Sequence, residues 1–134
     1  MPSFNDFRKT YFGDDEIQSR YAAASRLGRI PRTEVDDDDY TLDVDDVLVA
    51  FIALTAGRTL TLPLAATMVG SGPNNKVNSF IVKDESGDAS TYNITIQPSG
   101  GETIDGQVSA TINNNYGNLQ FYTNGIEWFS TYVM

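Results

Sequence analysis

The ten residues QFYTNGIEWF, at positions 120–129, give the clearest indication of the fold. Asn124 and Gly125 stand between two short runs that are rich in aromatic residues. Both positions of an Asn-Gly pair tolerate the positive φ angles that a two-residue hairpin turn requires. The pattern therefore predicts an antiparallel hairpin made of strands 120–123 and 126–129.

Short apolar runs separated by turn signals continue upstream of this hairpin. Leu60 and Leu62 alternate with threonines until Pro63 marks the end or the edge of a strand. The run 47–54 is apolar throughout, as in a strand covered on both faces. Further strands are expected at 40–45, 77–83, 92–97 and 108–112. This spacing predicts an all-β fold, a small antiparallel β-sandwich or barrel-like module of about seven or eight short strands.

The composition is that of an ordinary globular chain, and it excludes several kinds of chemistry. Hydrophobic residues make up 40% and charged residues 20% of the 134 residues, which is usual for a folded domain. The chain has no cysteine and no histidine. Disulfides, thiolate zinc sites and a Ser-His-Asp or Cys-His mechanism within one chain are therefore excluded. We expect a protein that is not an enzyme and that uses no cofactor and no metal.

The first 32 residues differ from the rest in composition and in charge. Four aromatic residues stand between positions 4 and 12 without strand alternation. Residues 1–32 hold six Lys and Arg against four Asp and Glu, a net charge of +2, and residues 33–134 hold three against fourteen, a net charge of −11; the sum is the −9 of the whole chain. A basic, aromatic segment on an acidic body indicates an arm that docks on another surface.

Helix signals occupy the second half of this arm. Ile17, Tyr21 and Leu27 lie on one stripe at helical spacing, acidic residues stand in the first turn, and Gly28 marks the end. We expect a short helix over about residues 14–27, or an extended segment when the arm is bound. The expected domains are a docking arm at 1–32, an acidic linker with four consecutive aspartates at 33–39, and a β-module at 40–134.

An ordered set of motifs follows in the second half of the chain. The strand at 92–97 leads into PSGGETIDG at 98–106, and then into VSATI, Tyr116, LQFY, Asn-Gly and Trp128. This order, with LTLP at 60–63, resembles the C-terminal β-module of bacteriophage head-fibre, head-decoration (cement) and tail-fibre proteins. The resemblance spans about residues 40–134.

The resemblance implies a component of the virion, often trimeric, that is fixed to the particle by its N-terminal segment. It does not separate head from tail. A tail fibre needs a long shaft between anchor and tip, and 39 residues leave no room for one. We therefore expect a capsid decoration protein or short head fibre that is assembled in the host cytoplasm and stabilises the shell. The alternative is a tail- or head-fibre receptor-binding tip that adheres to host surface glycans.

The expected partners are the major capsid protein or another virion protein, and further copies of the chain in a homotrimer. Aromatic and arginine side chains are enriched at the centres of protein interfaces. A charge of +2 is small for a nucleic-acid arm, so we expect no nucleic acid, and no apolar run is long enough for a membrane helix. The expected docking residues are Phe4, Phe7, Arg8, Tyr11, Phe12, Arg20 and Arg26.

A second set of candidates lies near the C-terminal end. Tyr116, Tyr122, Trp128 and Tyr132 are aromatic residues that could form a subunit interface or a ligand face. Strand alternation places Trp128 and Tyr132 on one face of the last strand. We favour a core or subunit-interface role over a sugar-binding role for them.

Two groups of carboxylates allow a chemical interpretation and a structural one. Glu102 and Asp105 stand three residues apart and could act as a glycosidase pair, but a turn at Asp105-Gly106 with a solvated Glu102 is the preferred interpretation. The aspartates at 36–39, 43, 45 and 46 could bind calcium. They lack EF-hand spacing, so a solvated acidic linker is preferred.

Overall fold

The computed structural model describes residues 29–69, 77 and 79–133, with Tyr132 and Val133 described by their backbone only. The chain divides into two compact units, Met1–Ile30 and Pro31–Met134. The predicted docking residues and the predicted helix at 14–27 lie outside the described residues. The second unit is the β-module.

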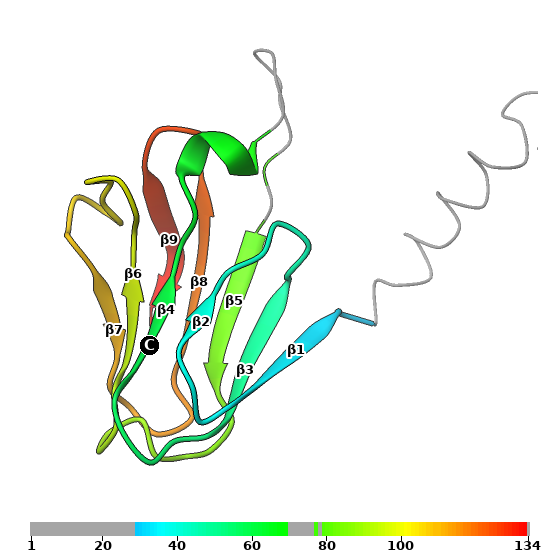
Figure 1. Ribbon diagram of the computed structural model, residues 1–134, viewed down its shortest axis with the longest axis vertical. Helices are drawn as coiled ribbons and strands as arrows, with labels where there is room; N and C mark the ends of the chain where they lie inside the picture. The colour runs from blue at the N-terminus through cyan, green and yellow to red at the C-terminus, as the bar shows by residue number, and fades with distance from the viewer. Residues whose placement is uncertain (1–28, 70–76, 78, 134) are drawn as a thin grey trace, which may run out of the picture. The chain divides into compact units, whose positions relative to one another are not determined.

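Nine strands and one short 3₁₀ helix make up the described secondary structure (Figure 1). They are β1 (Arg32–Asp36), β2 (Tyr40–Thr41), β3 (Leu48–Ala53), β4 (Arg58–Thr61), η2 (Ala65–Met68), β5 (Ser79–Asp84), β6 (Ile94–Gln97), β7 (Ala110–Ile112), β8 (Asn118–Thr123) and β9 (Trp128–Val133).

These strands form two sheets, one with the order β1-β3-β5-β8-β9 and one with the order β2-β4-β6-β7. From β1 to β6 the chain enters the two sheets alternately, and each strand from β3 onward pairs in parallel with the strand two places before it. This part winds like a flattened coil (Figure 1). The chain then reverses, and β7, β8 and β9 pair antiparallel with β6, β5 and β8.

The predicted all-β sandwich is confirmed, but its antiparallel character is wrong for the first six strands. Parallel neighbours need a long crossover between them. Here a strand of the opposite sheet supplies that crossover, as β4 does between β3 and β5. Alternation within single strands shows which face is buried and carries no information about this routing. The apolar run at 47–54 fits its observed place, because β3 is an interior strand with parallel neighbours on both sides.

The acidic segment 33–39 is not the unpacked linker that we expected. Most of β1 lies in it and pairs with β3 from Arg32↔Leu48 to Asp36↔Ala53. The next aspartates find partners at the corner that follows: Asp37 accepts hydrogen bonds from Thr55 and Arg58, and Asp39 accepts one from the backbone N–H of Thr59. Hydrogen bonds to charged acceptors offset the repulsion between neighbouring carboxylates.

The core lies between the two sheets and includes side chains from both. Trp128 from β9 is fully buried against Phe80 and Phe121, with ring centroids 6.1 and 5.8 Å away. The four-stranded sheet contributes Leu60, Ile94, Ile96 and Ile112. Among the described residues, no buried side-chain nitrogen or oxygen lacks a hydrogen-bond partner. The module therefore has a closed core of its own.

The predicted hairpin is present, but its loop is longer than two residues. Thr123 pairs with Trp128, so residues 124–127 form the connection. The Asn124 side chain accepts hydrogen bonds from the backbone N–H groups of Ile126 and Glu127. Such side-chain to backbone bonds stabilise wider turns. They extend the loop by two residues and move the start of the last strand from 126 to 128.

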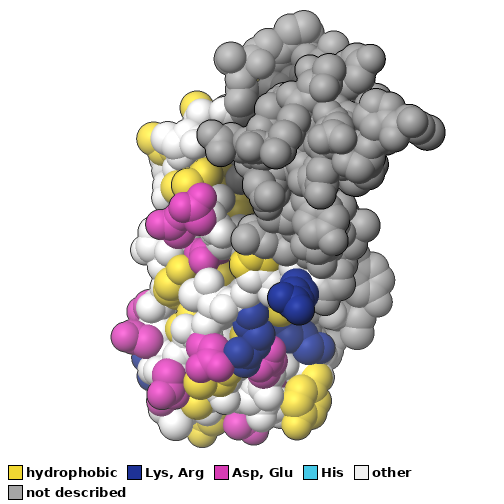
Figure 2. All heavy atoms as spheres, turned by 90° about the vertical axis from the view of Figure 1, so that its right-hand side faces the viewer, with side chains coloured by type: hydrophobic (Ala, Val, Ile, Leu, Met, Phe, Trp, Pro, Cys, Tyr) yellow, Lys and Arg dark blue, Asp and Glu magenta, His cyan; other side chains and the backbone are white. Residues whose placement is uncertain are grey.

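An ion pair crosses the outer face of the five-stranded sheet. Arg32 on β1 bonds Glu34 on the same strand and also Glu85, which follows β5. Because β3 lies between β1 and β5, this pair passes over β3, where the small side chain of Ala50 is fully buried. Figure 2 shows Lys and Arg side chains beside Asp and Glu side chains on one face of the molecule.

Hydrogen bonds at the corner after β1 make the stability of the fold depend on pH. The hydroxyl and backbone N–H of Thr55, with Arg58, lower the pKa of Asp37 from 3.8 to about 2. A pKa that is lower in the folded chain stabilises it above the unfolded value and loses this effect as the pH falls through the folded value. The melting temperature is therefore expected to fall between about pH 4 and pH 2, and less steeply in Asp37→Asn. Calorimetry at a series of pH values measures this; equal slopes would contradict it.

Candidate functional site

The structure separates the C-terminal aromatic residues that the sequence grouped together. Trp128 is a core residue with no exposed surface, so the favoured core role is confirmed for it, and an interface or ligand-face role is wrong. Tyr122 lies half-buried on β8 and packs against Phe129, with ring centroids 5.7 Å apart. Tyr132 belongs to β9, and its side chain is not described. Tyr116 lies in the loop between β7 and β8 and is 60% exposed.

Glu102 and Asp105 hold the fold together at the beginning of β9. Glu102 accepts hydrogen bonds from the backbone N–H of Ala65, at 3.0 Å, and from the Trp128 indole, at 3.4 Å. Asp105 accepts bonds from the backbone N–H and the hydroxyl of Ser130. The predicted turn at Asp105-Gly106 is present, and both residues have positive φ. We expected a solvated Glu102, but its carboxylate joins the loop after β6 to η2 and to the core tryptophan.

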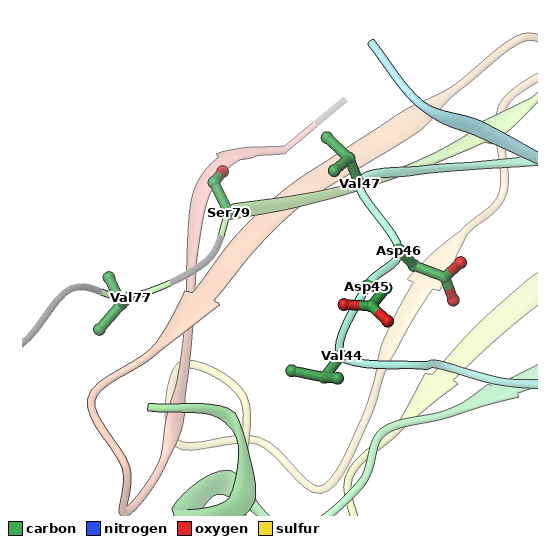
Figure 3. Close-up of a pocket in the computed structure, with 6 residues that line it drawn as sticks. All are labelled: Val44, Asp45, Asp46, Val47, Val77 and Ser79. Carbon is green, nitrogen blue, oxygen red and sulfur yellow. The ribbon is translucent and has the colours of Figure 1, made fainter. Parts of the chain in front are cut away.

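A shallow hollow of about 420 Å³ lies where the β2–β3 loop approaches the start of β5 (Figure 3). Its lining residues are Val44, Asp45, Asp46, Val47, Val77 and Ser79. The Asp46 carboxylate points away from Val77 and Ser79 (Figure 3) and accepts hydrogen bonds from the hydroxyls of Thr33 and Tyr40. Burial, and to a smaller extent the hydrogen bond to Asp46, raises the pKa of Tyr40 to about 12. Asp46 therefore serves to fix the loop.

The predicted strand at 40–45 is shorter than expected for the same reason. The backbone N–H of Asp43 bonds the Asp46 carboxylate, and the backbone N–H of Asp46 bonds the Asp43 carbonyl. These bonds turn the chain after Thr41, where β2 ends, and leave Val44 47% exposed. The alternation of Tyr40, Leu42 and Val44 did not anticipate a turn. In the described part of the chain, no group of three or more acidic side chains is placed to hold a metal ion.

A buried carboxylate organises two loops at the opposite end of the β-module. Asp84, at the end of β5, has no exposed surface. It accepts hydrogen bonds from the hydroxyl and backbone N–H of Ser86 and from the backbone N–H groups of Gly87, Ala89 and Tyr116. One side chain therefore fixes both the β5–β6 loop and the β7–β8 loop, which lie together at the lower end in Figure 1.

These hydrogen bonds keep Asp84 ionised. Burial acts to raise the pKa of Asp84, but the bonds from the Ser86 hydroxyl and from the backbone N–H groups of Ala89, Tyr116 and Gly87 outweigh it, and the net shift is downward. Hydrogen bonds to the charged form of a carboxylate favour that form. Sequence patterns did not single out Asp84. The only signal was its place between a strand and the turn-forming residues Ser86-Gly87.

Tyr116, in the β7–β8 loop, has an unusual backbone conformation. Its φ is 60°, in the left-handed region, and Gly87 beneath it has a φ of 81°. A Cβ atom on Gly87 would lie 2.6 Å from the Tyr116 ring, so a side chain at this position would displace the ring. The Tyr116 carbonyl accepts a hydrogen bond from the Lys83 ammonium. We call the exposed ring of Tyr116, with its support from Gly87 and Asp84, the Tyr116 platform.

Comparison with known proteins does not assign this chain to a family. Neither a scan against models of protein families nor a search of curated proteins finds a match. Within the described ranges, no helix has the length and apolar character needed to cross a membrane.

Proposed function

We propose that this chain is a structural protein of a bacteriophage virion, a capsid decoration protein or short head fibre that its N-terminal unit anchors to the particle. The observation that carries the proposal is the division of the chain after Ile30 into a β-module with its own core and a separate N-terminal unit. The order of motifs across about residues 40–134, which resembles phage fibre and decoration modules, supports the same proposal.

The chemistry of the two parts favours docking on protein. The β-module holds fourteen carboxylates, and Asp84, Asp46, Asp37 and Glu102 bind groups of the module itself. Its acidic surface repels nucleic acid. The N-terminal unit supplies the aromatic and arginine residues that are enriched at protein interfaces. A protein that binds only the assembled shell stabilises the shell by mass action.

Deletion of residues 1–30 is expected to abolish binding to the particle and to leave the β-module folded. The cut preserves Arg32, whose side chain bonds Glu34 and Glu85. Co-sedimentation with shells that lack this protein measures binding, and circular dichroism with thermal melting measures folding. Replacing Phe4, Phe7, Tyr11 and Phe12 together with alanine is expected to have the same effect on binding.

Val108→Ala is the matched control, because Val108 is 76% exposed on the β-module and is expected to play no part in docking. Full binding by the truncated, folded module would refute the docking role of the N-terminal unit. Binding of monomeric protein to single shell subunits as tightly as to assembled shells would refute lattice stabilisation.

The alternative function is a receptor-binding tip that adheres to host glycans. One observation favours it, since Tyr116 is 60% exposed and Asp84 holds its backbone N–H. Glycan binding by the β-module, together with no stabilisation of shells by the full-length protein, would favour this function over shell stabilisation.

A further inference from the structure

We propose that the Tyr116 platform is a carbohydrate-binding subsite that takes one pyranose ring of an uncharged glycan. The subsite lies in the β-module and does not depend on docking by the N-terminal unit. It gives the glycan-binding alternative a specific place, and its test is separate from the particle-binding test.

The backbone conformation of Tyr116 is costly for a tyrosine. Left-handed φ angles are uncommon outside glycine, and asparagine adopts them several-fold more often than most residues; the cost for other residues is on the order of 1 kcal/mol. Asn113, Asn114 and Asn115 precede Tyr116, and Gly117 follows it. Residues suited to this conformation therefore surround the position, and yet a tyrosine occupies it. Contact with Gly87 covers part of the Tyr116 ring, and 60% of the residue stays exposed.

The support under the ring is rigid before any ligand arrives. Asp84 bonds the backbone N–H groups of both Gly87 and Tyr116. A second link joins the two loops, because the Asn115 side chain accepts a hydrogen bond from the backbone N–H of Ser90. Because these bonds fix the backbone that carries the ring, the loops lose little conformational freedom on association, which favours affinity.

Polar residues of the two loops that carry the platform suit a ligand that is rich in hydroxyls. Asp88, Ser90, Asn113 and Asn114 are exposed residues of the same two loops, and their side chains make no hydrogen bond within the described part of the chain. Amide and hydroxyl groups both donate to and accept from hydroxyls, and an ionised carboxylate accepts from them. A pyranose ring can place its apolar C–H face on the tyrosine while such polar groups fix its orientation, as in other small-molecule sites.

The charges near the platform argue against anionic ligands. Asp88 contributes negative charge to the β5–β6 loop, and Glu85 in the same loop is ion-paired with Arg32. The nearest cation, Lys83, donates to the Tyr116 carbonyl. Phosphate groups and nucleic acids need clustered cations, which these two loops lack in the described residues. An uncharged saccharide is therefore the ligand class that fits.

The test uses ¹⁵N-labelled full-length protein titrated with the methyl glycosides of glucose, galactose, mannose and N-acetylglucosamine at millimolar concentrations. At least one glycoside is expected to shift the amide signals of Gly87, Tyr116 and Gly117, and to receive saturation transfer from the protein. Tyr116→Asn should keep the fold, because asparagine suits the backbone, and should weaken binding by about tenfold or more, equivalent to about 1.4 kcal/mol. Tyr116→Phe keeps the ring and should bind almost as the unchanged protein does.

Val108→Ala, an exposed apolar change in the β6–β7 loop, is the control and should leave binding unchanged. Binding that survives Tyr116→Asn overturns the inference. So does the absence of a shift at these amides with all four glycosides, or a response centred on Tyr122 instead. Binding of a proline-rich peptide at the platform without glycoside binding also overturns it. Particle binding by the Tyr116→Asn protein is measured as well. If it is retained, the glycan-binding inference and the docking proposal are tested independently of each other.

Discussion

Replacing Asp84 with alanine is expected to lower the free energy of unfolding by about 3–5 kcal/mol, one of the largest single effects in the β-module. The carboxylate is fully buried and accepts hydrogen bonds from donors in two loops. Its removal leaves several backbone N–H groups without a partner, and each buried, unsatisfied donor is costly. The substitution affects both the β5–β6 loop and the β7–β8 loop, so the Tyr116 platform should also lose its order.

Urea unfolding followed by tryptophan fluorescence measures this effect, since Trp128 lies in the core. Asp88→Ala is the matched control, because this exposed aspartate belongs to the same loop and its side chain makes no hydrogen bond within the described residues. Asp84→Asn should lie between the two, because its amide oxygen still accepts hydrogen bonds at one position, whereas its amide nitrogen cannot accept those at the other. A loss of less than about 1 kcal/mol in Asp84→Ala would show that the loops hold without this carboxylate.

Replacing Trp128 with alanine is the second large expected effect, at about 3–5 kcal/mol. The indole is fully buried against Phe80 and Phe121, and its nitrogen donates to Glu102. The variant therefore leaves a cavity between the sheets and removes the indole hydrogen bond from β9 to Glu102 in the loop after β6. Truncating a buried aromatic residue costs both transfer energy and cavity energy.

Tyr122→Ala is the informative comparison, because Tyr122 is half-buried on the same sheet and contacts Phe129. It should cost about 1 kcal/mol or less, in the range of a single cross-strand pair. Chemical unfolding followed by circular dichroism suits both variants, since one of them lacks the fluorophore. Equal losses for the two variants would contradict the assignment of Trp128 to the core.

The sequence patterns predicted most of the strands and the fold class. Period-two alternation located β4, and the Asn-Gly pair located the β8–β9 hairpin. These signals are local, because they depend on which face of a strand is buried and on which residues allow a turn. Pairing between strands of a sheet is not local. The parallel pairing of β3 with β5 joins segments that are separated by β4 and η2, and no short pattern specifies it.

The candidate site was predictable only in part. Tyr116 was among the aromatic candidates, but Trp128 was grouped with it because alternation does not distinguish an inner face from an outer one. Asp84 was missed because a buried aspartate and a solvated one look alike in sequence. Its role depends on Ala89 and Tyr116, which lie 5 and 32 positions away. Acidic residues near turns were assigned to solvent, and the structure gives several of them structural roles.

The flattened coil of β1 to β6 has a consequence for how the chain acquires its structure. Each parallel pair can form only after the chain has crossed to the other sheet, added a strand there and returned. The strands β8 and β9, in contrast, are joined by four residues. Closing a long loop costs more entropy than closing a short one, and such contacts form slowly. The C-terminal hairpin should therefore nucleate folding, β5 should add to it, and β1 should join last. Amide hydrogens of β1 are then expected to exchange fastest among the strands of the five-stranded sheet.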